Sequence, residues 1–146
     1  QNNKLFWDGT DWNKISKNVD NDHKMCYRIK TAYLHGALDG RLFAYLKTWD
    51  ENQTLADSVF SENVDYLSNR ELIRNLDFFY LDPLNSYIPI PSAIVIANMY
   101  GRRIPPLEID SYIESTKDWI NNLEINLDTL DYSKLLNEKW MRSKAN

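Results

Sequence analysis

The sequence is poor in the residues that build disulfide, metal and cofactor sites. Of its 146 residues, one is cysteine, Cys26, and two are histidine. A single cysteine forms no intramolecular disulfide, and three cysteine and histidine residues are fewer than the roughly four ligands of a structural zinc site. The Cys-x-x-Cys-His haem signature, Gly-rich phosphate loops, Gly-x-Ser-x-Gly and His-Glu-x-x-His are also missing. The sequence therefore predicts no metal and no cofactor.

Long hydrophobic runs and an excess of positive charge are absent as well. The apolar run around residues 94–97, like every other in the sequence, is far shorter than the roughly 20 residues that span a bilayer. The net charge is −4 at pH 7, whereas nucleic-acid binding needs clustered Lys and Arg. The sequence thus predicts neither a membrane span nor a nucleic-acid partner. Because the chain starts at Gln1 and not at Met, we expect a processed N-terminus and a periplasmic or extracellular location, while a cytoplasmic location stays open.

Glycine and proline are scarce, with four and five residues, which excludes collagen-like and low-complexity chains. The 43% hydrophobic and 26% charged residues are typical of a globular protein. The length suits one domain, so we expect residues 1–146 to form a single helical domain. A folded protein of this mass exposes roughly 7,800 Å².

Apolar periodicity and capping residues predict an all-α protein, a compact bundle of five or six helices. Apolar residues at three- and four-residue steps predict one long helix at about 22–49. Ser68 and Glu71 form a capping-box pattern that starts a helix ending near Tyr80. Pro91 and Pro106 suit the first turns of two further helices.

Three other residues are predicted to mark helix ends. Thr10 is expected to cap a short helix at about 11–18. Gly101 is expected to end a helix in the left-handed conformation. Asp128 is expected to cap a last helix at about 129–143.

A row of small residues runs along the long helix at a spacing of four. Two glycines inside a helix cost roughly 1 kcal/mol each relative to alanine, so some contact should offset them. We interpret the row as a close-packing surface for another helix or a large ring, and an apolar ligand groove is the alternative. The row comprises Ala32, Gly36, Gly40 and Ala44.

Asp77 and Asp82 flank an aromatic stretch and could form the carboxylate pair of a small glycan hydrolase. We favour a structural interpretation of the loop at 82–91. Asp82 precedes a proline at a helix end, and Asp82 and Asn85 are of the type that bonds neighbouring backbone amides. We expect Asp82 and Asn85 to form a structural loop motif and expect no catalytic residue.

The order of several short motifs resembles a group of small, exported, helical bacterial proteins of unassigned activity, over roughly residues 9–115. That group is itself similar to the helical immunity proteins that neutralise cell-wall amidase toxins of type VI secretion. The resemblance implies an all-helical fold, a periplasmic or surface location and a non-catalytic role. The motifs are Gly9-Thr10-Asp11-Trp12, Lys30-x-x-Tyr33-x-x-Gly36-x-x-Asp39-Gly40 and Asp77-x-Phe79-Tyr80-x-Asp82-x-x-Asn85-x-x-Ile88-Pro89-Ile90-x-x-Ala93.

The leading hypothesis is therefore a non-enzymatic envelope protein, immunity- or adaptor-like, that acts by binding another protein. A homodimer stays open. The alternatives are a small cell-wall glycan hydrolase that uses paired carboxylates and a binder of a small apolar ligand.

Overall fold

The structure is a computed structural model that describes residues 4–18, 22–60, 67–129 and 132–145. This part of the chain is almost entirely helical, and its only β pairing is an isolated bridge between Asp8 and Pro89. The all-α class and the single long helix are confirmed. The elements are α1 (Gly9–Asn18), α2 (His23–Glu51), α3 (Gln53–Val59), α4 (Asn69–Phe79), the 3-10 helix η1 (Pro83–Asn85), α5 (Ile90–Gly101), α6 (Pro106–Thr129) and α7 (Tyr132–Ala145).

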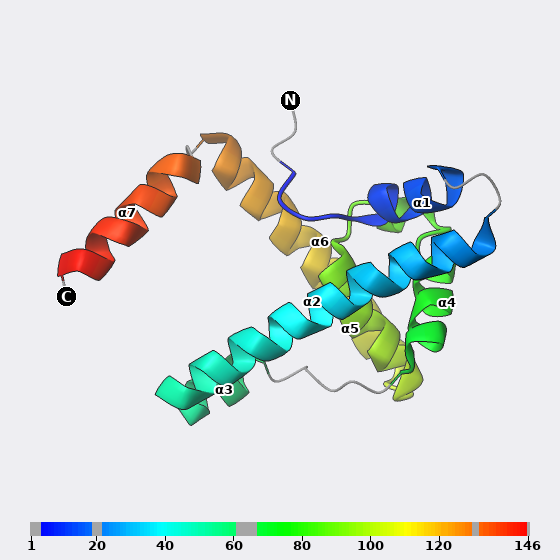
Figure 1. Cartoon of the computed structure of the whole chain (residues 1–146), viewed down its shortest axis with the longest axis horizontal. Helices are drawn as coiled ribbons and strands as arrows, with labels where there is room; N and C mark the ends of the chain where they lie inside the picture. The colour runs from blue at the N-terminus through cyan, green and yellow to red at the C-terminus, as the bar shows by residue number, and fades with distance from the viewer. Residues whose placement is uncertain (1–3, 19–21, 61–66, 130–131, 146) are drawn as a thin grey trace.

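Seven α-helices in the described ranges exceed the expected five or six, because the chain after α2 forms the separate short helix α3. Asn52 makes this possible. Its backbone is extended, which breaks α2, and its side chain accepts a hydrogen bond from the Leu55 N–H at 2.9 Å, which starts α3. The last part of α2 and all of α3 then fold back on each other as a hairpin, called here the α2–α3 hairpin (residues 39–59) (Figure 1).

Helix starts that depend on local side chains are where the sequence places them. The Ser68 hydroxyl oxygen accepts from the Glu71 N–H at 3.3 Å and donates to the Glu71 carboxylate at 2.9 Å, at the start of α4. Pro91 lies in the first turn of α5, and α6 begins at Pro106. Such residues act within one turn, so neighbouring helices do not alter their effect.

The three other predicted caps were wrong. Asp8, not Thr10, caps α1, because its carboxylate accepts from the Thr10 N–H at 2.9 Å. Gly101 is helical, and the left-handed conformation occurs two residues later at Arg103, with φ of 57°. Asp128 lies inside α6, which continues because the buried Ile120 and Leu127, seven residues apart, lie on one face of the helix.

The hydrophobic core lies between α1, the first half of α2, α4 and α5, and these elements form what we call the body. Its largest fully buried side chains are Trp12 and Tyr80. A second, smaller cluster joins α5 to α6 through Ile88, Ile96 and Ile109. The main cluster consists of Trp12, Leu34, Leu72, Ile73, Leu76, Tyr80, Ile90, Ala93, Ile94 and Ala97.

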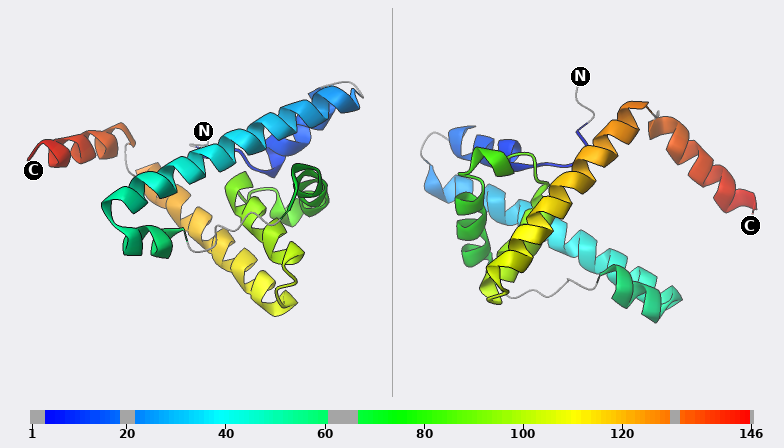
Figure 2. Two further views of the ribbon diagram at one scale, coloured as in Figure 1. Left: turned by 60° about the horizontal axis from the view of Figure 1, so that its bottom comes forward. Right: turned by 180° about the vertical axis from the view of Figure 1, so that it is seen from behind.

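Two segments project from the body. The α2–α3 hairpin leaves it at one side, and α7 lies apart from α1 to α5 in every view (Figures 1 and 2). The accessible surface is 10,654 Å², well above the roughly 7,800 Å² of a compact protein of this mass. The molecule is therefore more open than the compact bundle expected. None of the described helices has the length and apolar character needed to cross a membrane.

Candidate functional site

The sequence motifs that carry the resemblance meet at one junction in the body. Trp12 from α1 donates its indole N–H to Asp77 of α4 at 2.8 Å. Lys30 from α2 donates to the same carboxylate oxygen at 2.7 Å and to the Ser16 hydroxyl at 3.1 Å. The Lys30 ammonium also lies 4.9 Å from the centre of the Trp12 ring. One charged pair thus ties three helices together.

Lys30 is the first position of the second motif, but its burial and its pairing with Asp77 were not predicted from the sequence. Its side chain is 4% exposed, whereas that of Asp77 is half-exposed. A weak signal existed, because Lys30 stands four residues before Leu34, which is the other buried residue of α2. The Asp77 oxygen that accepts from both Trp12 and Lys30 is engaged in holding the helices. This arrangement gives Asp77 a structural role.

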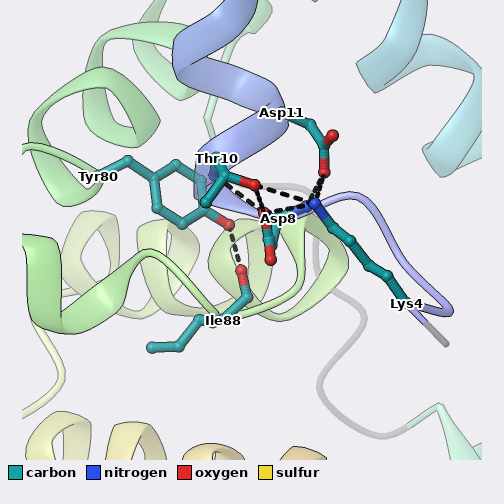
Figure 3. Close-up of polar contacts among 6 residues, drawn as sticks. All are labelled: Lys4, Asp8, Thr10, Asp11, Tyr80 and Ile88. Atoms are coloured by element: carbon teal, nitrogen blue, oxygen red, sulfur yellow. Dashed lines mark hydrogen bonds and ion pairs between the residues drawn. The ribbon is translucent and has the colours of Figure 1, made fainter. Parts of the chain in front are cut away.

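A second polar cluster fixes the N-terminal segment to the start of α1 (Figure 3). The Lys4 ammonium pairs with Asp8 at 3.0 Å and with Asp11, and it donates to the Thr10 hydroxyl at 2.9 Å. Burial alone would lower the pKa of Lys4, but the hydrogen bonds to both carboxylates outweigh it and the pKa is raised. Burial would likewise raise the pKa of Asp11, and the bonds from Lys4 and the Asp8 N–H lower it instead. Both groups are therefore held in their charged forms.

Tyr80 connects this cluster to the loop before α5. Its hydroxyl donates to the Ile88 carbonyl at 2.7 Å (Figure 3). Burial, followed by the nearby charge of Asp8, raises its pKa. The ring leaves no room at Gly9, where an added Cβ would lie 2.4 Å from the Tyr80 Cδ1 atom. Gly9 therefore lets α1 approach the ring and lets its own N–H reach the Ser86 carbonyl at 3.0 Å.

The predicted loop residues bond to backbone groups. The Asp82 carboxylate accepts from the Leu84 N–H at 2.9 Å, which caps η1. The Asn85 side-chain amide donates to the Phe79 carbonyl at 3.1 Å. Asp82 and Asp77 are on opposite sides of the aromatic stretch in sequence, and each is engaged with different partners.

The close-packing interpretation of the small-residue row was wrong at both glycines. A Cβ added to Gly36 or Gly40 would meet nothing within 4 Å among the described residues. Ala32 is exposed and Ala44 is half-buried. The row faces away from the body because Lys30 and Leu34 occupy the buried side of α2.

The histidines and the cysteine do not gather into a metal site. Cys26 lies 3.7 Å from the Ser16 hydroxyl, and His35 contacts Asn69 at 2.8 Å. Within the described ranges, no three His, Cys, Asp or Glu side chains lie close enough to hold a metal ion.

Besides a cleft of about 340 Å³ that Asp77 borders together with Arg70 and Arg74, two further clefts open in the described surface. One, of about 360 Å³, separates the α2–α3 hairpin from the body and is bordered by Leu38, Phe60 and Ile94. The other, of about 730 Å³, lies between α4, η1, α5 and α6, and has Ile96 and Ala97 among its lining residues. Its rim carries Asp82, so the loop motif borders the larger cleft.

Large apolar side chains are exposed on both projecting segments. Phe43 is 66% exposed on the hairpin, and Trp140 is 53% exposed on α7. The hairpin is nevertheless held together, since Tyr45 packs edge-on against Phe60 and donates its hydroxyl to Asp57 at 2.8 Å. The exposed apolar residues of the two segments are Leu42, Phe43, Leu46, Trp49, Leu55 and Val59 on the hairpin, and Leu136, Trp140 and Met141 on α7.

Comparison of the chain with models of protein families, with curated proteins and with solved structures finds no match.

Proposed function

We propose that this chain is a non-enzymatic protein that acts by binding another protein through its projecting segments. The observation that carries the proposal is the set of large apolar side chains exposed on the hairpin and on α7, among them Phe43 and Trp140. A standard protein–protein interface removes about 800 Å² from each partner. We call the surface that these two segments expose the surplus surface and propose that such an interface forms there.

The chemistry of the surplus surface supports a protein partner. Trp49, Phe43 and Trp140 are of the residue types that anchor interfaces, and each is at least 40% exposed. These side chains spread over an extended hairpin and a separate helix, and a small ligand could not cover them. Adjacent exposed apolar residues on one face of a monomer typically mark an interaction site.

The proposal includes the immunity- or adaptor-like role and the bacterial envelope location that the sequence motifs imply. The partner is another protein, and a second copy of this chain is one form that it could take. The role of Asp77, which holds α1, α2 and α4 together, supports a binding protein over a glycan hydrolase.

Site-specific photocrosslinking tests this proposal. A benzoylphenylalanine at Phe43 or Trp140 in living cells should give an adduct of discrete mass, and the same label at the exposed Lys24 of the body should give none. An adduct of twice the chain mass identifies a homodimer. No adduct at either projecting position, or equal adducts at Lys24, would contradict the proposal.

A peptidoglycan turbidity assay separates this function from glycan hydrolysis. We expect no clearing by the wild-type protein. Clearing that Asp82→Asn abolishes at an unchanged melting temperature would make the protein a hydrolase and would overturn the proposal.

A further inference from the structure

The larger cleft combines an apolar floor with an aromatic wall. Ile96 and Ala97 of α5 are 1% and 4% exposed and line its base. Phe78 and Tyr100, which border the opening, are 78% and 49% exposed. Leu81 beside them is 74% exposed. Such a set suits a side chain with an apolar stem.

The charge at the rim has one dominant sign. Asp82, Asp110 and Glu114 place three carboxylates around the opening, against the single ammonium of Lys117. Lys117 lies 3.6 Å from Glu114, and this pair leaves Asp82 and Asp110 as the two rim carboxylates that no described cation pairs with. Asp110 has no hydrogen bond or ion pair within the part of the chain that the structure describes, and Asp82 accepts only from a backbone N–H there. The rim is therefore complementary to a positive charge.

Aromatic rings add to this preference, because the faces of Tyr and Phe rings attract cations. Lys and Arg side chains carry an apolar stem below a charged head, which matches an apolar floor below an acidic rim. The exposed ring of Phe78 and the exposed Leu81 add apolar surface at the cleft. A protein surface can cover these exposed apolar side chains together with the acidic rim, whereas an isolated small cation cannot.

We propose that this cleft accepts a lysine or arginine side chain of a protein partner. The stem of that side chain lies over Ile96 and Ala97, and its charged head lies near Asp110 and the Tyr100 ring, with Glu114 shared between it and Lys117. The assignment rests on the proposed binding function and adds the chemistry of the partner: a basic residue next to apolar ones.

A peptide titration followed by amide chemical shifts tests the assignment. The probe is acetyl-Phe-Arg-amide, and its matched control is acetyl-Phe-citrulline-amide, which has the same shape without the charge. We expect the arginine peptide to shift signals of residues 96–100 and 110–117 and to bind at least threefold more tightly than the citrulline peptide. Added salt at 0.5 M should remove most of this difference.

Charge-neutral variants localise the effect. Asp110→Asn combined with Glu114→Gln should weaken binding of the arginine peptide at least threefold and leave the citrulline peptide unchanged. Asp118→Asn is the matched control, because Asp118 is exposed on α6 and does not line the cleft. Equal affinity for the two peptides, shifts confined to other residues, or wild-type affinity in the double variant would overturn the assignment.

The two proposals fail separately. The crosslinking positions are on α2 and α7, outside this cleft. Loss of peptide preference therefore contradicts the cleft assignment alone, and absence of crosslinks contradicts the proposed function alone.

Discussion

Two helices of similar length, α5 and α7, show opposite uses of apolar residues. α5 has 12 residues and buries seven of them, including the polar Asn98. α7 has 14 residues, and from Ser133 onward none of its described side chains is buried. Both helices carry large apolar residues, but within the described ranges only α5 is surrounded by other elements. Apolar residues in a helix therefore indicate a surface that burial would stabilise. The position of the helix decides whether its own chain buries that surface or leaves it open to a partner.

The largest expected difference between the body and α7 concerns two tryptophans. Trp12→Ala should cost about 3–5 kcal/mol of unfolding free energy, because it leaves a cavity and removes the bond to Asp77. Trp140→Ala should change stability by no more than about 0.5 kcal/mol. Urea unfolding of both variants measures the contrast. Equal losses would show that α7 packs on the body in solution.

Sequence reasoning succeeded where the decisive contacts are local. The Ser68–Glu71 pair and the prolines at 91 and 106 start their helices at the expected places. It failed at Asp128, because α6 continues past this residue along the face that buries Ile120 and Leu127. At Gly101 the helix ends near the expected place, but the left-handed conformation lies at Arg103. Local preference also cannot reveal that the apolar side chains of α7 stay exposed among the residues that the structure describes.

The junction was harder to foresee for the same reason. Trp12 and Asp77 are 65 residues apart, and a lone lysine such as Lys30 resembles an ordinary surface residue in sequence. The small-residue row gave the opposite error, because here a contact was predicted that the structure does not contain among the described residues. The helical cost of Gly36 and Gly40 suggested an offsetting contact, and the described structure places none there.

The Lys30–Asp77 pair should give the next largest effect. Asp77→Ala leaves a buried ammonium whose remaining partners among the described residues are Ser16 and the Trp12 ring, and we expect a loss of about 2–3 kcal/mol. Lys30→Met in the same chain should recover part of this loss, because the unpaired charge is then gone. Asp118→Ala on the exposed face of α6 serves as the control. Additive losses in the double variant would contradict a direct pair.

Gly9 should tolerate an added side chain less well than Gly36 or Gly40 of α2. Gly9→Ala forces a methyl group against the Tyr80 ring and the Ser86 backbone, and overpacking of this kind costs about 1–3 kcal/mol. Thermal unfolding compared with Gly40→Ala isolates the contact, since the same methyl group meets open space at Gly40. A wild-type melting temperature for Gly9→Ala would mean that α1 does not approach the ring this closely.

Alkaline pH should weaken the body through Tyr80. The pKa of Tyr80 is raised in the folded state, so its protonated hydroxyl favours folding. This contribution to stability is complete below the unfolded pKa of about 10 and is lost as pH rises further. The stability should fall by up to about 1.4 kcal/mol per pH unit from this group. Tyr33 and Lys4 also have raised pKa values, so the comparison with Tyr80→Phe is needed to isolate it. Urea unfolding at pH 9, 10 and 11 should show a shallower decline for the variant, and parallel declines would exclude Tyr80 as the source.

The smallest expected effect has the opposite sign and concerns the open side of α2. Gly36→Ala adds a better helix former where nothing lies within 4 Å, so it should stabilise the protein by about 0.5–1 kcal/mol. Gly36→Leu should likewise leave the melting temperature unchanged or raised. A loss of stability in both variants would mean that another surface covers this row in solution. If the loss also grew with protein concentration, that surface would belong to a second copy of the chain, and the open face of α2 would then join the projecting segments as a binding surface.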